Sequence, residues 1–244
     1  MSYELLCVLV FSAAYTVNLI YISVFFHRGL AHRAANLRPW LRRWVIRSGN
    51  WITGIDPLAW ACMHRLHHAY ADTDKDPHSP HNSGILPLAL TQLYVYKRVL
   101  RGLIRREQAY TLRVLDLDFP VSWLNRRGLW MLPYILHAAL AVIVAVLVGF
   151  WAVGLCYFIG ITSHPVQGWL VNAFGHAWGY RNFATKDRSV NNTLIAWLVF
   201  GEGYQNNHHQ RPRSAKFSVK WWEVDPGYGL CLLLEVLGLI RIKR

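Results

Sequence analysis

The sequence predicts an all-α fold, an integral membrane helical bundle with a cytoplasmic helical cap. Three observations predict it. The chain is 54% hydrophobic, with 12 Trp, 12 Tyr and 10 Phe, which is rich for a soluble protein. Two segments are apolar over lengths that can cross a hydrocarbon core, which takes about 20 helical residues. Histidines also recur in short clusters at helical spacings, at the ends of the apolar segments and between them.

The two apolar segments predict three membrane spans. The first covers about residues 5–26. The second, residues 129–171, is about twice the length of one span and is interrupted near Gly149. We therefore expect a hairpin with spans at about 129–148 and 152–171. Arginines gather in the loops after the first span, so the positive-inside rule places the histidine clusters on the cytoplasmic side and the hairpin turn outside.

The remaining segments predict the cap. Residues 39–61 mix tryptophans with arginines and are interrupted at Pro57, which is typical of an amphipathic helix at the membrane interface. An arginine at the bilayer centre costs several kcal/mol, which argues against a span there. We expect residues 64–127 and 176–244 to form the cap, and residues 1–244 to form a single membrane domain.

Charge and cysteine usage exclude two other classes of protein. The net charge is +13, but the basic residues lie beside the spans and form no separate basic module, so we expect no nucleic-acid partner. An anionic lipid surface or an acidic protein suits this charge better. The four cysteines stand alone, without the paired spacing of zinc or redox sites.

The histidine clusters are the candidate functional residues. They read His27-x4-His32, His64-x2-His67-His68, Asn172-x3-His176 and Gln205-x2-His208-His209. Residues at i, i+3 and i+4 share one face of a helix, and imidazole is the commonest metal ligand in proteins. Eight histidines exceed the needs of a single four- to six-coordinate ion, so the cap is predicted to hold a di-metal site.

The first cluster has a different spacing. His27 and His32 point about 140° apart in an ideal α-helix, which predicts that they serve two different ions. Imidazole suits zinc, copper, iron and nickel, so the ligands do not name the metal. A buried dinuclear site against apolar helices fits iron and oxygen chemistry on an apolar substrate.

In order and spacing, these clusters resemble those of the membrane acyl-CoA desaturases of the delta-9 (stearoyl-CoA) type, here in a short bacterial-like form. The flanking residues 72–80, 179–181 and 221–225 agree with this family, and the resemblance covers residues 21–240. The resemblance implies two iron ions, for which zinc is a non-productive substitute, and dioxygen as co-substrate. It also implies that the enzyme introduces a cis double bond into an acyl chain, which in this type of desaturase is carried on coenzyme A. The implied metal ligands are His27, His32, His64, His67, His68, His176, His208 and His209.

The resemblance also assigns roles to three further residues. Asn172 is expected to hold a metal-bound water. Gln205 stands where the family usually has a ninth histidine, and its amide oxygen can ligate weakly or hold a water. Trp60 is most simply part of an interfacial tryptophan belt, and it is also a candidate for the lining of the acyl tunnel. Two external electrons are expected from a separate carrier, such as a ferredoxin or cytochrome b5 with its reductase, attracted by the basic face.

Some alternatives stay open. Cys62 and Met63 replace charged residues that lie near the coenzyme A head group in relatives, so acyl-CoA, acyl-carrier protein and phospholipid all remain candidate substrate forms. Only 26 residues precede His27, so we expect one span of the usual four to be absent and the N-terminus to face outward. Hydroxylation of an acyl chain on the same scaffold is the main alternative reaction.

A non-catalytic relative and a metal transporter are the minor alternatives. A transporter needs ionisable residues along a path through the bilayer, and the hairpin offers only His137 and His164. We expect both of these to be structural. His78 and His81 lie in a polar loop and are expected to support the ligands from outside or to lie at the surface. Asp72, Asp74 and Asp76 either orient ligand imidazoles or cap the loop.

Overall fold

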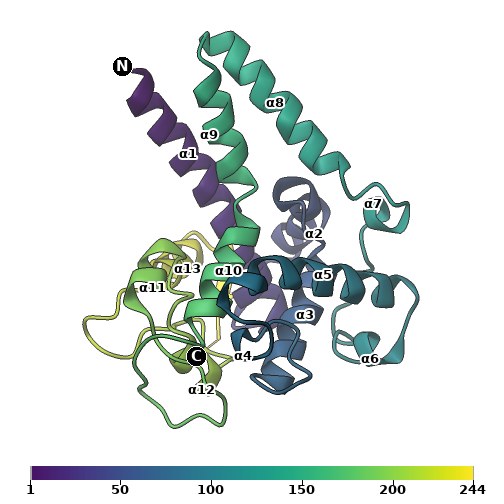
Figure 1. The fold of residues 1–244 in the computed structure, drawn as a ribbon, viewed down its shortest axis with the longest axis vertical. Coiled ribbons are helices and arrows are strands. Elements are labelled where there is room, and N and C mark those ends of the chain that lie inside the picture. The colour runs from purple at the N-terminus through teal and green to yellow at the C-terminus, as the bar shows by residue number, and fades with distance from the viewer. Residues whose placement is uncertain (1, 244) are drawn as a thin grey trace.

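The computed structural model describes residues 2–243, which are mainly helical, as predicted. Three apolar helices, α1 (Tyr3–Leu19), α8 (Leu132–Val148) and α9 (Trp151–Ile161), project together from a broader helical body (Figure 1). The body contains the other helices and most of the polar residues. This arrangement corresponds to the predicted division into a bundle and a cap.

The first helix is longer than its predicted span. After Leu19 it continues as a π-helix, η1 (Ile20–Ala31). Within the described chain, Tyr3–Ala31 is the one helix long and apolar enough to cross a membrane, while α8, α9 and α13 (Pro226–Val236) are shorter apolar helices. Helix α8 exposes Ile135, Val142 and Leu147. Such an apolar surface indicates contact with lipid or another apolar partner.

The predicted hairpin is present, but its second arm is not one helix. Gly149 ends α8 with a φ of 73°, a left-handed conformation that glycine adopts without strain. Helix α9 ends at Ile161, and α10 (His164–Phe174) begins after a two-residue break. The segment expected as one span at 152–171 is therefore not one continuous helix, because Pro165 has no N–H to continue the helical hydrogen bonds.

The hairpin packs closely on the first helix. A Cβ added to Gly160 would lie 2.7 Å from the backbone oxygen of Phe11, so these helices approach with no room for a side chain. The rings of Tyr3 and Phe150 pack with centroids 4.8 Å apart. The start of α1 thus lies beside the hairpin turn, at the end of the bundle away from the cap (Figure 1).

The amphipathic segment also differs from its expected form. It forms α2 (Pro39–Thr53) and the start of α3 (Pro57–Tyr70). The interruption expected at Pro57 is present, but it separates two helices where one interfacial helix over 39–61 was expected. Gly54 ends α2 with a φ of 72°, and the Asp56 carboxylate then accepts hydrogen bonds from the first N–H groups of α3. The break directs α3, which carries the second histidine cluster, into the cap.

The remaining elements complete the cap around η1 and α3. They are α4 (Pro80–Ser83), α5 (Ile85–Ile104), α6 (Gln108–Thr111), α7 (Trp123–Arg126), α11 (Thr193–Leu198) and α12 (Gln205–Gln210). The sequence did not predict a small antiparallel ribbon of β1 (Ala35–Leu37) and β2 (Ile240–Ile242), in which Asn36 pairs with Arg241. This ribbon fixes the C-terminal end of the chain to the end of η1. Buried residues of η1, including Val24 and Phe26, form the adjoining apolar core with Val45 and Cys231.

Candidate metal centre

The eight histidines of the four clusters lie in two adjacent groups. We call the first the five-histidine group, and its members are His27, His32, His64, His68 and His208. Their Nε2 atoms converge. The His32–His64 pair is 2.7 Å apart, the His68–His208 pair 2.9 Å, and the His27–His208 and His64–His68 pairs 3.0 Å. Three separate parts of the chain, η1, α3 and α12, therefore supply one cluster of nitrogens.

The π-helix brings the first two of these histidines together. In a π-helix the backbone bonds link residues five apart, and the His32 N–H indeed donates to the His27 oxygen at 3.1 Å. The two imidazole rings lie 4.9 Å apart between centroids. The expectation that His27 and His32 serve different ions is therefore wrong, because it assumed the 100° per residue of an α-helix.

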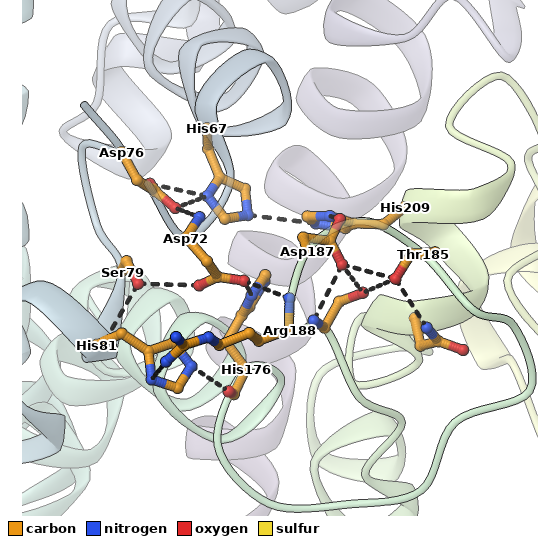
Figure 2. Close-up of polar contacts among 12 residues, drawn as sticks. His67, Asp72, Asp76, Ser79, His81, His176, Thr185, Asp187, Arg188 and His209 are labelled. Carbon is orange, nitrogen blue, oxygen red and sulfur yellow. Dashed lines mark hydrogen bonds and ion pairs between the residues drawn. The ribbon is translucent and has the colours of Figure 1, made fainter. Parts of the chain in front are cut away.

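We call the second set the three-histidine group, which consists of His67, His176 and His209. The Nε2 atoms of His67 and His209 are 3.2 Å apart. His67 points away from His64 and His68 on the same helix, so α3 contributes to both groups. His176 lies just after the end of α10, and Figure 2 shows it below His67 and His209, facing the same space.

These nitrogens fit metal ions better than they fit one another as hydrogen-bond partners. Each Nε2 of His64, His68 and His208 faces two other Nε2 atoms, although a neutral ring nitrogen either donates one hydrogen or accepts. Two ligands at right angles on an ion with metal–nitrogen bonds of about 2.1 Å lie about 3.0 Å apart, whereas tetrahedral ligands lie about 3.4 Å apart. The five-histidine group fits a five- or six-coordinate ion more closely than a tetrahedral one.

The protonation of the rings suits metal binding. Burial, reinforced by the neighbouring imidazoles, lowers the pKa of His64, His68 and His208 well below the ordinary value. Burial also lowers the pKa of His209 to about 4. These rings are therefore neutral near pH 7, which is the form that binds metals.

Carboxylates orient four of the imidazoles through their Nδ1 atoms. Asp76 contacts His67 at 3.0 Å, Asp72 contacts His176 at 2.9 Å, and Asp187 contacts His209 at 2.8 Å (Figure 2). Glu202 contacts His27 at 2.6 Å. Each contact directs the Nε2 atom of its ring toward the group, as carboxylates commonly do for metal-bound histidines.

The surroundings of the three aspartates favour their charged form. Burial favours a raised pKa for Asp72, but His176, the Arg188 N–H and the Ser79 hydroxyl together outweigh it and lower the pKa to about 2. Burial likewise opposes ionisation of Asp76 and Asp187, yet their histidine partners hold each pKa well below its usual range. Asp72 and Asp76 thus orient imidazoles, one of the two roles open to them, whereas Asp74 is exposed.

Sequence reasoning missed Asp187 and Glu202. Asp187 lies 22 residues before its partner His209, and Glu202 lies 175 residues from His27, so no local spacing links them. Glu202 does stand three residues before Gln205, and a carboxylate so close to the last histidine cluster is the signal that could have found it. Its second oxygen contacts the buried Arg28 at 2.9 Å, which in turn contacts Asp225 at 3.0 Å.

A mostly apolar cavity adjoins the histidines, between η1, α3, α5 and α10. Its apolar lining includes Ile22, Trp60, Met63, Leu93 and Val171. The indole of Trp60 stacks on the His64 ring with centroids 5.1 Å apart, so the cavity reaches the five-histidine group. Asn172 and Gln205 also line it, together with His27, His64, His78 and Glu202.

The other predicted histidines have separate surroundings. His137 binds the Tyr157 hydroxyl at 2.8 Å and the Trp51 carbonyl at 2.9 Å, so it is a hydrogen-bonded structural residue as expected, although half-buried. His164 lines the cavity. His81 contacts the His176 carbonyl at 2.9 Å. His78 is buried, and burial lowers its pKa to about 3, so a surface position for it is wrong.

Comparisons with known proteins give the family. Residues 4–228 match the family model of fatty acid desaturases. Delta-9 desaturase-like 4 protein of Arabidopsis thaliana is 32% identical over 92% of this chain and 72% of its own length. The sn-1 stearoyl-lipid 9-desaturase of Anabaena variabilis is 33% identical over 89% of this chain and 76% of its own length. Acyl-CoA C20 Delta5-desaturase of Anemone leveillei is 34% identical over 88% of this chain and 66% of its own length.

The two histidine groups, the carboxylates behind them and the apolar cavity occur in a chain whose relatives are lipid and acyl-CoA desaturases. The family is membrane-associated, in agreement with the long apolar helix. This chain therefore belongs to the fatty acid desaturase family and is an oxidoreductase that acts on fatty acyl chains.

Proposed function

We propose that this protein is a di-iron desaturase that uses dioxygen and two external electrons to introduce a cis double bond into a fatty acyl chain. The observation that carries the proposal is the convergence of eight imidazoles in two adjacent groups beside an apolar cavity. One ion would be held by the five-histidine group and the other by the three-histidine group. Bound iron would supply the one-electron and oxygen chemistry that unactivated C–H bonds require, which zinc cannot supply.

The residues of the chain prepare the site for this reaction. Asp72, Asp76, Asp187 and Glu202 hold the imidazoles in place before any ion arrives. Asn172 lines the cavity one turn before His176, which supports a role in holding a water on the second ion. Trp60 stands between the cavity and His64, a position suited to packing against the acyl chain. The apolar lining excludes bulk water from the reacting carbons.

The substrate form and the electron donor follow from the same proposal. We infer an acyl-CoA substrate, although the names of the relatives include both acyl-CoA and acyl-lipid desaturases. The histidine groups lie at the arginine-rich end of the molecule, which supports a cytoplasmic active site and an acidic donor such as a ferredoxin or cytochrome b5 with its reductase.

The decisive experiment combines metal analysis with lipid analysis. The protein is expressed with iron and a reductase system, purified for metal content, and the cellular lipids are examined by mass spectrometry. About two irons per chain and new monounsaturated acyl chains are expected. Acyl chains that gain one oxygen would instead identify a hydroxylase. Unchanged products from supplied acyl-CoA and phospholipid, despite bound iron, would contradict catalysis.

A further inference from the structure

His78 is a buried imidazole without a hydrogen-bond partner. It lies in the loop between α3 and α4, and 6% of its surface is exposed. Neither Nδ1 nor Nε2 has a hydrogen-bond partner within residues 2–243. A buried polar group left unpaired costs about 1–3 kcal/mol, so an enclosed imidazole with two such atoms indicates a binding partner that the chain itself does not provide.

The position of His78 indicates what that partner is. Its ring lies 4.5 Å from the His67 ring, measured between centroids. Asp76 orients both residues, since its carboxylate accepts the His78 backbone N–H at 3.0 Å and also contacts Nδ1 of His67. His67, Asp76 and His78 form a further cluster of metal-ligand atoms, all within 4.8 Å of one another. The free imidazole therefore adjoins the three-histidine group.

The two histidine groups are unequal. One contains five imidazoles and the other three among the residues that the structure describes. Gln205 lines the adjoining cavity, but its amide nitrogen donates to the Glu202 carbonyl at 2.7 Å, which fixes the side chain in the protein. An amide oxygen is also a poorer ligand than imidazole for iron or zinc. The three-histidine group thus lacks a strong fourth ligand.

We propose that His78 is the fourth imidazole ligand of the metal ion held by His67, His176 and His209. In the present arrangement its ring stands at the edge of the group, near His67 but not within 4.8 Å of all three, so the side chain turns inward when the ion binds. The inference rests on the proposed function for the presence of a second ion. It adds a ligand that belongs to none of the four clusters.

The test measures metal retention by the purified full-length protein, loaded anaerobically with iron(II) and then challenged with a chelator. The unaltered protein should retain about two irons per chain. His78→Ala should retain about one iron and bind the second at least about 100-fold more weakly. Even residues that only hydrogen-bond to metal ligands contribute about 10- to 100-fold to metal affinity. His164→Ala is the matched control, because His164 is half-buried, lines the same cavity and has a buried, unpartnered Nδ1.

A rescue variant separates ligation from folding. His78→Ala combined with Gln205→His should regain the second ion, because residue 205 shares a helical face with His208 and His209. Cobalt(II) absorption provides a second readout, and its intensity should change in His78→Ala but not in His164→Ala. Retention of two irons by His78→Ala with unchanged affinity would overturn the ligand role alone. Fewer than two irons in the unaltered protein would overturn the proposed di-iron function together with this inference.

Discussion

Nδ1 of His27 lies 2.6 Å from one carboxylate oxygen of Glu202, in a pair that joins the first histidine cluster to the loop before the last one. The other oxygen of Glu202 contacts Arg28, which lies wholly inside the protein. One carboxylate thus orients a candidate ligand and neutralises a buried cation. The metal centre and the packing of η1 against the C-terminal part of the cap consequently depend on the same residue.

Glu202→Gln tests this double role. The substitution keeps the size of the side chain but removes the charge, so Arg28 keeps only Asp225 as an ionic partner. We expect metal affinity to fall about 10- to 100-fold. Stability should fall by about 3 kcal/mol, because a buried charge loses a partner. Chelator competition and thermal unfolding of the metal-free protein measure the two effects, and unchanged values in both would contradict this role.

Asp76→Asn should weaken metal binding in the three-histidine group. The variant loses the charged contact that orients His67, and an effect of about 10-fold or more on affinity is expected. Asp74→Asn in the same loop is the control, since Asp74 is exposed. Iron retained per chain under a fixed chelator concentration distinguishes the two variants. Equal losses in both would indicate a general effect on the loop.

His208→Ala and His67→Ala should each abolish desaturation while the protein still inserts into the membrane. Each variant removes a nitrogen from a different group without altering the apolar helices. We expect each to lose about one iron, measured on the purified protein alongside the lipid profile. His137→Gln should keep its iron, because His137 bonds to Tyr157 and Trp51 and belongs to neither group. Full desaturation by either ligand variant would rule out the di-iron assignment.

The metal-free protein should lose stability as the pH falls. Burial lowers the folded pKa of His78 to about 3 and that of His209 to about 4, both below the ordinary 6.5. Between these pKa values and 6.5, the two histidines bind more protons in the unfolded state than in the folded state. The free energy of unfolding is therefore highest above about pH 6.5 and declines steadily toward pH 4, by several kcal/mol in total. Chemical unfolding at pH 8, 6 and 5 after metal removal measures this, and a flat profile would contradict it.

Gly160→Leu should disrupt the packing of α9 on α1. The added side chain would meet the backbone of Phe11 and Tyr15, which cannot move aside without separating the helices. Overpacking of this kind costs about 1–3 kcal/mol or more. Gly229→Leu in α13 is the control, since nothing lies within 4 Å of the added Cβ there. Thermal stability in one detergent should fall for the first variant and stay near the original value for the second.

The sequence by itself determined the helical class, the long first apolar helix, the hairpin turn at Gly149 and the set of clustered histidines. These are local properties: apolar length, a glycine that accepts a positive φ, and spacing along one helix face. The helix break before Pro165 is also a local property, but the apolar run across it favoured one longer helix.

The tertiary structure decided how the histidines are divided. His27 and His32 came together because η1 is a π-helix, which a residue pattern based on 3.6 residues per turn does not reveal. His67 separated from His64 and His68 because α3 lies between the two groups. Partners such as Glu202, Asp187 and the enclosed His78 depend on contacts between distant or differently folded segments, and such contacts arise only when the helices pack.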